Sequence, residues 1–470
     1  MDDKDVIIAQ LRQENAELRT QVQELGTLVT QLRDEIARLK KNSSNSSKPP
    51  SSDIVKPPKP TPPRGKKRKR IGGQPGHSRQ QREPFGPDEI DTIQTYTLAS
   101  CPKCGGAVQP ARRPPRVLQQ MEIPAIPLEV TEHRGLAYWC PRCRKLHYAP
   151  LPTDVRRAGL VGPRLTALVA YLKGSCHASY STIRAFCRDV LKQNLSRSQL
   201  AKLVARSSEA MADAYGQLRD ELPKRPRLNV DETGHKDNGR GHWTWCFRAD
   251  EFTLFHIDAS RGSNVLIDLL GEEFNGVLGC DYFSAYRKYM ADFNVLVQFC
   301  LAHLIRDVKF LTELPNRVTA NYGRRVLKEL RRLFGVIHRR ESMTPAGFQR
   351  ALQRARESLL AVAKRPPPRR EARNLAERFH KHGRAYFQFI TTPGVEPTNN
   401  LAEQAIRFVV MDRHVTQGTR SLSGRQWCQR IWTAIATCRQ QNRSVFEYLH
   451  QTITSHLQNA PTPSLLPVTS

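Results

Sequence analysis

Hydrophobic residues follow a seven-residue repeat through residues 1–41. Leucine occupies each d position of this pattern, and mainly β-branched residues occupy the a positions. Such a pattern favours a parallel two-stranded coiled coil, a leucine zipper, in which one buried asparagine fixes register and dimer state. The alternative is a single amphipathic helix that packs on its own domain. The residues expected at the dimer seam are Leu11, Asn15, Leu18, Val22, Leu25, Val29, Leu32, Ile36 and Leu39.

Helical periodicity returns in residues 158–222 and marks helices near 163–173, 181–192 and 197–218. Ser181 and Ser196 are the expected N-caps of the second and third helices. Short helices joined by short turns are typical of a helix-turn-helix DNA-binding unit, and equally of a bundle that links two domains. Both interpretations stay open from the pattern alone.

The pattern changes to strands within residues 223–450. Three stretches rich in β-branched and aromatic residues follow one another, with Asp-Asn-Gly between the first two, which predicts antiparallel hairpins. Two further strands then alternate with helices, an order typical of an RNase H-like α/β fold. The strands are expected at 227–230, 241–247, 252–257, 277–280 and 295–299, and the helices at 261–270, 283–290 and 302–311.

The remainder of this region is predicted to be helical. Residues 312–395 are rich in arginine and are expected to form a helical insertion within the core. A last helix near 425–450 is expected to pack on the sheet, and residues 451–470 are expected to form a tail.

Three acidic residues occupy positions that suit a metal-binding carboxylate. Asp231 follows the first predicted strand, Asp281 ends the fourth, and Glu403 lies in the opening turn of a predicted helix. Two strand ends and one helix can bring three carboxylates together, and such a cluster holds divalent cations for phosphoryl transfer. Glu396 is an alternative third ligand.

Composition indicates a polyanionic partner for this chemistry. The chain has 470 residues, 74 Lys and Arg against 44 Asp and Glu, and a net charge of +30. This imbalance is typical of proteins that bind nucleic acid. No apolar stretch of about 18 residues predicts a membrane span, and the N-terminus lacks a signal-peptide pattern. We therefore expect no membrane partner.

A basic tract follows the heptads, within residues 42–80, which are expected to be disordered because they are rich in Ser, Pro and Lys. Consecutive cations attract DNA phosphates without reading sequence; a merely solvated charge run is the alternative. A basic-zipper transcription factor is excluded because its basic region would precede the zipper. The tract consists of Lys66, Lys67, Arg68, Lys69 and Arg70.

Two Cys-Pro-x-Cys pairs lie within residues 95–150. Thiolates spaced in this way can both face one tetrahedral Zn²⁺, so Cys101, Cys104, Cys140 and Cys143 predict a zinc ribbon with one structural zinc. The strands of the ribbon are expected between Val130 and Trp139. The odd total of eleven cysteines favours a reducing compartment over disulfides. Less favoured substitute ligands are His133 and His147.

Several of these motifs, in this order, resemble the transposases of the insertion-sequence sixty-six family, a group of DDE transposases. The resemblance rests on the leucine-rich start, GGQPGH at 72–77, the two cysteine pairs, VDETG at 230–234, CDYFSAY at 280–286, CLAH at 300–303 and PTNNLAEQAIR at 397–407. Tyr282 departs from the family pattern, which has glycine after this aspartate.

The resemblance implies a transposase that cleaves the ends of its insertion sequence and transfers 3′-OH strands to target DNA. It makes Asp231, Asp281 and Glu403 the DDE triad, which would hold two Mg²⁺ or Mn²⁺ ions per active site. It also implies DNA partners at the terminal repeats and the target, a homodimer or higher oligomer, element-encoded accessory proteins, and a prokaryotic cytoplasmic, nucleoid-associated location.

Some residues near the triad carry alternative roles. Glu403 could instead complete a capping box with Asn400. Arg407, one helical turn later, could pair with Glu403 or bind a DNA phosphate. Glu232 should point to the opposite face of its strand from Asp231. We expect His303 to be a packed or hydrogen-bonded helix residue, although it could be taken for a zinc ligand with Cys300.

Three other functions compete with transposition. The first is an inactive, transposase-derived DNA-binding protein. The second is an RNase H-like nuclease or resolvase that cuts without strand transfer. The third is a zinc-ribbon regulator, for which residues 223–450 would be superfluous.

Overall fold

The computed structural model describes residues 3–41, 45, 83–109, 113–124 and 127–467. The chain divides into two compact units, one of Met1–Pro58 with His133–Ser470 and the other of Lys59–Glu132. The basic tract at 66–70 lies outside the described residues, as does most of the predicted linker. None of the helices in the described part of the chain is long and apolar enough to cross a membrane.

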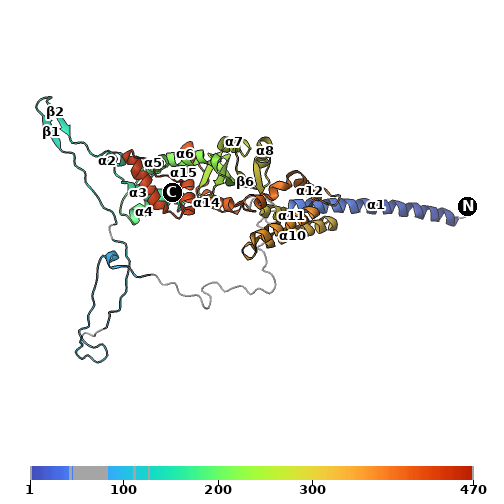
Figure 1. Ribbon diagram of the computed structural model, residues 1–470, viewed down its shortest axis with the longest axis horizontal. Helices are drawn as coiled ribbons and strands as arrows, with labels where there is room; N and C mark the ends of the chain where they lie inside the picture. The colour runs from blue at the N-terminus through green and yellow to red at the C-terminus, as the bar shows by residue number, and fades with distance from the viewer. Residues whose placement is uncertain (1–2, 42–44, 46–82, 110–112, 125–126, 468–470) are drawn as a thin grey trace. The chain divides into compact units, whose positions relative to one another are not determined.

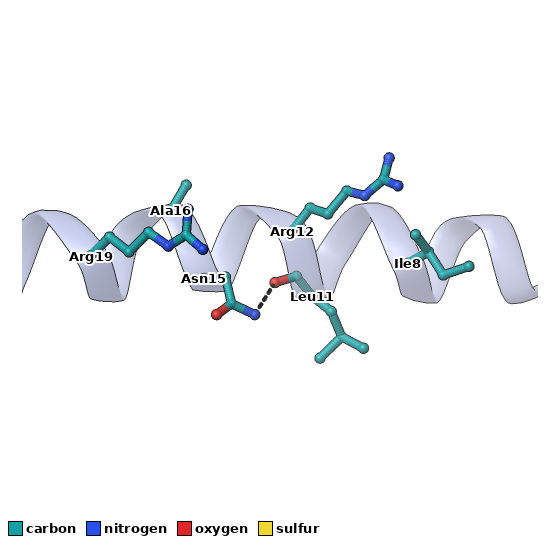
Figure 2. A pocket seen from close by; sticks show the side chains of 6 residues that line it. All are labelled: Ile8, Leu11, Arg12, Asn15, Ala16 and Arg19. Atoms are coloured by element: carbon teal, nitrogen blue, oxygen red, sulfur yellow. Dashed lines mark hydrogen bonds between the residues drawn. The ribbon is translucent and has the colours of Figure 1, made fainter.

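The heptad region forms one long helix, α1 (Asp3–Leu39) (Figure 1). Its predicted seam is exposed in the single chain, with Leu18 at 57% and Leu25 at 60%. The alternative interpretation required this apolar stripe to pack on the chain's own domain. Its exposure shows that it does not. Figure 2 shows Leu11 and Asn15 on one side of α1 and Arg12 and Ala16 on the other. The Asn15 Nδ2–H donates to the Leu11 carbonyl oxygen at 3.0 Å.

The second unit and the start of the region after it contain little regular structure among their described residues. The second unit holds a short 3₁₀ turn, η2 (Pro87–Glu89). After it, β1 (Ala137–Cys140) and β2 (Lys145–Tyr148) form an antiparallel hairpin. The strand that we expected between Val130 and Trp139 therefore begins only at Ala137.

The helical segment contains α2 (Thr153–Ala158), α3 (Pro163–Gly174), α4 (Tyr180–Asp189), α5 (Arg197–Ala210) and α6 (Ala212–Glu221). The third predicted helix is thus two helices that meet at Met211. Ser196 caps α5 in a capping box, as predicted. The prediction of Ser181 as a cap is wrong, because the side chain of Ser179 accepts the N–H of Thr182 at the start of α4. Helix α16 (Val445–Gln458) covers α2, α3 and α5, so this segment is part of a larger helical bundle.

A five-stranded mixed sheet forms the core of the following region. A short turn, η3 (Leu222–Lys224), leads into it. The strand order is β5-β4-β3-β6-β7; β3, β4 and β5 are antiparallel, and β6 and β7 run parallel to β3. Asn238 and Gly239, with φ of 49° and 78°, form the predicted hairpin turn. The strands are β3 (Arg227–Asp237), β4 (Arg240–Arg248), β5 (Thr253–Asp258), β6 (Val277–Cys280) and β7 (Leu296–Phe299).

Helices connect the parallel strands and cover the sheet (Figure 1). The connections are α7 (Asn264–Leu270) between β5 and β6 and α8 (Ser284–Phe293) between β6 and β7, and α9 (Leu301–Glu313) follows β7. Helix α15 (Leu422–Gln440) lies along β5, where Thr437 Oγ1 and Thr433 Oγ1 accept the backbone N–H groups of Thr253 and Phe255. Side chains of α15 therefore pair the backbone donors that this edge strand would otherwise leave open.

The predicted C-terminal helix is interrupted. Helix α15 ends at Gln440, and α16 (Val445–Gln458) follows after a turn in which Asn442 has φ of 54°. The tail that we expected from residue 451 therefore begins only after Gln458. This turn allows α16 to leave the sheet and cover the helical segment.

The insertion is helical, as predicted. It contains α10 (Arg317–Ile337), η4 (Arg340–Ser342), α11 (Pro345–Ala363), α12 (Arg370–His382), η5 (Gly383–Tyr386) and α13 (Gln388–Thr391). Helix α10 packs on α9 and α11, which joins the insertion to the core. The chain returns to the sheet through α14 (Asn400–Thr416).

Candidate active site

The parallel pairing of β3 with β6 brings the two aspartates together. Asn229 pairs with Gly279 at the last position of the ladder. Asp231 lies two residues after Asn229, and Asp281 lies two residues after Gly279. The two aspartates therefore follow the last paired position by the same number of residues. All four residues of β6 are buried, whereas in β3 the buried Leu228 and Val230 alternate with the half-buried Arg227 and Asn229. Local sequence therefore places both carboxylates at one edge of the β3–β6 pair.

Asn399 attaches the start of α14 to this edge. Its side chain is nearly fully buried, its Nδ2–H donates to the Val230 carbonyl at 2.7 Å, and its Oδ1 accepts from Asn229 Nδ2 at 2.9 Å. Its backbone N–H donates to Cys300 Sγ at 3.2 Å, which joins α14 to the start of α9. Glu403, in the first turn of α14, is thereby fixed beside Asp231.

Glu403 has no capping role. The N-cap of α14 is Asn399, without a side-chain capping bond, so the capping box with Asn400 is not formed. The Glu403 carboxylate lies 3.5 Å from both His303 Nδ1 and Arg306 Nη2. Arg407 is exposed, and the ion pairs found for Glu403 among the described residues do not include it. Glu396 is exposed in the loop before α14.

The pKa values of Asp231 and Asp281 are both raised, mainly by burial. Burial raises the pKa of Asp231 well above its usual range, and the charges of Glu232, Asp281 and Glu403 raise it further. Burial, followed by the charge of Glu232, raises the pKa of Asp281 to about 7. Together, Asp231, Asp281 and Glu403 form what we call the carboxylate cluster.

The chemistry of the carboxylate cluster suits a hard divalent cation, although among the described residues only Cys300, His303 and Glu403 bring one ligand atom each within 4.8 Å of one another. All three side chains of the carboxylate cluster offer oxygen donors, which Mg²⁺ and Mn²⁺ prefer. Glu403 Oε1 is buried without a hydrogen-bond partner among the described residues. A bound cation would both occupy that oxygen and relieve the repulsion that raises the pKa of the aspartates.

Glu232 directly follows Asp231 on β3, where successive side chains alternate between the two faces. Its side chain is 2% exposed and accepts two hydrogen bonds from Arg261. The Tyr286 hydroxyl on α8 also donates to it. Glu232 nevertheless acts electrostatically on both aspartates, which the alternation of strand faces alone did not indicate.

A second set of potential ligands adjoins Glu403. One ligand atom each from Cys300, His303 and Glu403 lies within 4.8 Å of the others. Burial raises the pKa of the Cys300 thiol to about 11, so it stays protonated near neutral pH and is a poor metal ligand. His303 Nε2 lies 3.0 Å from Arg306 Nη2, and burial lowers the pKa of His303 to about 4. This agrees with our prediction of a hydrogen-bonded helix histidine.

Each Cys-Pro-x-Cys pair forms its own tight turn. The Gly105 N–H donates to the Cys101 carbonyl, and the Cys101 N–H donates to the Gly106 carbonyl, both at 2.8 Å. Cys140 ends β1 and Cys143 lies in the turn before β2. Hydrogen bonds from backbone N–H groups lower the pKa of the Cys101 and Cys140 thiols, which favours the thiolate form that binds metal.

The two cysteine turns belong to different compact units. His147 Nε2 lies 3.2 Å from Cys143 Sγ, whereas His133 is exposed in the chain before β1. Within its own unit, His147 is thus the better placed of the two substitute ligands.

Comparison with known families shows which family the chain belongs to. Residues 158–426 match a family described as "Transposase IS66 family", which covers more than half of the chain. The chain belongs to the IS66 family of transposases. Residues 99–144 match the zinc-finger binding domain of transposase IS66, and residues 2–83 match a family of unknown function, DUF6444. No curated protein matches the chain.

Membership of the IS66 family makes this protein a DNA-acting transposase. The matched region includes the helical segment, the sheet and all three residues of the carboxylate cluster. The zinc-finger match supports a structural zinc and DNA binding. A zinc-ribbon regulator without a catalytic domain is therefore excluded, and the resemblance inferred from the sequence motifs is confirmed.

Sequence reasoning missed Asn399 and Asn229. Both were visible as asparagines beside Asp231 and Glu403, and Asn399-Asn400 precedes a helix, where asparagine usually serves as a cap. The hydrogen bonds of Asn399 to Asn229 and Val230 join residues far apart in the chain, so no local sequence pattern could predict them.

Proposed function

We propose that this transposase cleaves DNA at the ends of its insertion sequence and joins the freed 3′-OH strands to target DNA by two-metal phosphoryl transfer. Asp231, Asp281 and Glu403 are its DDE triad. The observation that carries the proposal is geometric: the pairing of β3 with β6 places Asp231 and Asp281 at one edge of the sheet, and Asn399 bonds the start of α14, which carries Glu403, to β3. Three carboxylates brought together in this way suit divalent cations.

We further propose that the core is RNase H-like. The strand order β5-β4-β3-β6-β7, with three antiparallel strands followed by two parallel to the first, supports this assignment. The first aspartate lies on the central strand, and the second follows the strand that pairs with it in parallel.

The chain's own residues perform the positioning in this mechanism. Asp231, Asp281 and Glu403 would hold the cations, and Asn399 keeps Glu403 against β3. When bound, two Mg²⁺ or Mn²⁺ ions would lower the pKa of an attacking water and stabilise charge on the leaving 3′ oxygen. In the second step the freed 3′-OH takes the place of water and attacks target DNA. No serine or tyrosine nucleophile is needed, because no covalent protein–DNA intermediate forms.

The function is tested by incubating the purified protein with Mg²⁺, a target plasmid and DNA that carries the flanking ends of its gene. We expect joined products from the wild type and none from Asp231→Asn. Cleavage without joining would favour the nuclease alternative. DNA binding with neither reaction would favour an inactive binding protein.

We propose that DNA is also bound outside the carboxylate cluster. Arg407 is exposed one helical turn after Glu403, where a phosphate near the cluster could reach it. The basic tract of Lys66, Lys67, Arg68, Lys69 and Arg70 supplies consecutive cations that would bind the DNA backbone irrespective of sequence.

We propose that Cys101, Cys104, Cys140 and Cys143 bind one structural zinc. The purified protein should contain about one equivalent of zinc, because the four thiolates complete a closed tetrahedral site. Cys140→Ser should lose nearly all of it, measured by metal analysis of the purified protein. The matched control is Cys176→Ser, which changes an exposed cysteine outside both turns. Full zinc content in Cys140→Ser would contradict the assignment.

We propose that α1 pairs with a second copy of itself through its exposed seam. Changing Leu18 and Leu25 together to asparagine should turn a dimer into a monomer in sedimentation velocity, because each dimer loses four buried leucines at several kcal/mol in total. The control changes Thr20 and Thr27 to asparagine, since these residues occupy the outward f positions of the same heptads. A dimer that survives the leucine changes would show that α1 is not the dimerisation element.

A further inference from the structure

Arg261 lies in the loop between β5 and α7, and its contacts fix the plane of its guanidinium group. Its Nε–H and Nη2–H donate to Glu232 Oε1 at 3.0 and 2.7 Å. Its guanidinium carbon lies 4.3 Å from the centre of the Trp243 ring and 3.9 Å from that of Phe283. Two hydrogen bonds and two cation–π contacts leave this side chain little freedom.

The carboxylate that binds Arg261 is itself immobilised. Glu232 is 2% exposed, and it accepts a hydrogen bond from Tyr286, which is fully buried. An ion pair with one member this deeply buried gives little net stability, because desolvation offsets the attraction. Arg261 is therefore rigidly held by an arrangement that stability alone does not readily explain.

Arg261 keeps hydrogen-bonding capacity toward solvent. Its side chain is 34% exposed. A guanidinium has five N–H donors, and the hydrogen bonds found for it among the described residues use only the Nε–H and Nη2. The Nη1 amino group is left to bind a ligand. A planar, permanently charged fork of this kind suits a phosphate oxygen better than a lysine ammonium does.

Two observations place Arg261 next to the carboxylate cluster. Phe283, whose ring contacts the guanidinium, donates its backbone N–H to Asp281 Oδ1 at 2.8 Å. Glu232, which binds the guanidinium, directly follows Asp231 on β3. The guanidinium therefore contacts residues within two positions of both aspartates.

We propose that Arg261 is a phosphate-binding residue of the active site, holding a backbone phosphodiester at or beside the scissile bond, with Glu232, Tyr286, Trp243 and Phe283 as its positioning residues. This proposal rests on the proposed function, because it needs DNA at the carboxylate cluster. Arg261 and its supports come from β3, β4, α8 and two loops, so the sequence motif around Asp231 alone does not contain the site.

The test replaces phosphates around the cleavage site, one at a time, by uncharged methylphosphonates. Wild type and Arg261→Lys are compared for DNA affinity by fluorescence anisotropy and for single-turnover cleavage in Mg²⁺. We expect Arg261→Lys to cleave about 10²-fold more slowly. We also expect one phosphate position whose neutralisation weakens the wild type about tenfold or more but has little further effect in the variant. If neutralising that phosphate no longer has an effect once Arg261 is replaced, Arg261 contacts that phosphate directly.

Controls separate contact from structure. Arg240→Lys, at the exposed β3–β4 turn, should keep the wild-type sensitivity at every phosphate position. The double variant Glu232→Gln with Arg261→Gln avoids an unpaired buried charge, so it should fold with a melting temperature near that of the wild type and still lack the phosphate coupling. Stabilisation of Arg261→Lys by Mn²⁺, measured as a melting-temperature shift, should match the wild type because the carboxylate cluster is intact.

Equal sensitivity of wild type and Arg261→Lys at every phosphate position would overturn the proposal, as would normal cleavage by the double variant. Failure of the proposed function has a different signature. If the wild type binds DNA but never cleaves it, the reaction is rejected, while coupling in the anisotropy measurement still reports whether Arg261 contacts a phosphate.

Discussion

Asp281→Asn should lower Mg²⁺-dependent DNA cleavage by about 10³-fold or more, because loss of one cation ligand removes several kcal/mol of transition-state stabilisation. DNA affinity without Mg²⁺ should be maintained or improved, since the change removes a negative charge from the site. Cleavage is measured in single turnover and affinity by anisotropy. The control is Asp292→Asn, an exposed aspartate on α8 that should behave like the wild type. Cleavage within a few-fold of the wild type would show that Asp281 is not a ligand.

The same substitution should change how stability depends on pH in the metal-free protein. The pKa of Asp281 is raised to about 7 in the folded chain, whereas an unfolded aspartate titrates near pH 3.9. A carboxyl with a raised pKa stabilises the fold fully below about pH 4, and this contribution is lost as the pH rises to about 7.

Urea unfolding of the metal-free proteins measures this effect. The free energy of unfolding of the wild type should fall relative to Asp281→Asn between pH 4 and pH 7.5, by on the order of 1–4 kcal/mol. Mg²⁺ should then stabilise the wild type and not the variant. Parallel pH profiles for the two proteins would contradict the electrostatic description of the site.

Asn399→Ala should both destabilise the core and nearly abolish cleavage. The substitution leaves the Val230 carbonyl and the Asn229 amide without their partner in a buried place, which costs about 2–4 kcal/mol. It also frees the start of α14, so Glu403 is no longer held beside Asp231. We expect the cleavage rate to fall by about 10²-fold or more even at temperatures where the variant is fully folded.

Asn400→Ala is the matched control for Asn399, because it is the next residue and is exposed. It should change the free energy of unfolding by less than about 0.5 kcal/mol and leave cleavage intact. If both alanine variants cleave at the wild-type rate once folded, Asn399 has a structural role only, and another contact must position Glu403.

The sheet and the two aspartates were predictable because their signals are local. Each strand is a short apolar or alternating run, and Asp281 comes directly after β6, whereas β3 continues past Asp231 to Asp237 and not only to Val230 as predicted. The run before Asp231 therefore marks only the first part of its strand. Glu403 required the family motif, since an acidic residue in a first helical turn is common in any helix.

Features that depend on contacts between distant residues were not predictable. Two continuous helical patterns are interrupted, one at Met211 between α5 and α6 and the other at the turn that contains Asn442. The second interruption allows α16 to pack on α2, α3 and α5. Ser179 rather than Ser181 caps α4, one residue before the helix begins at Tyr180. The contact of Asn399 with β3 spans 169 residues of sequence, and the role of Glu232 became visible only once Arg261 and Tyr286 lay against it.

The central claim is that Asp231, Asp281 and Glu403 form one cation-binding centre. Anomalous scattering from crystals of the full chain grown with Mn²⁺ and element-end DNA tests it most directly. We predict at least one manganese peak that bridges carboxylate oxygens of Asp231 and Asp281, with Glu403 beside it, at metal–oxygen distances of about 2.1 Å. Manganese bound elsewhere, with these three carboxylates free of metal, would contradict the claim.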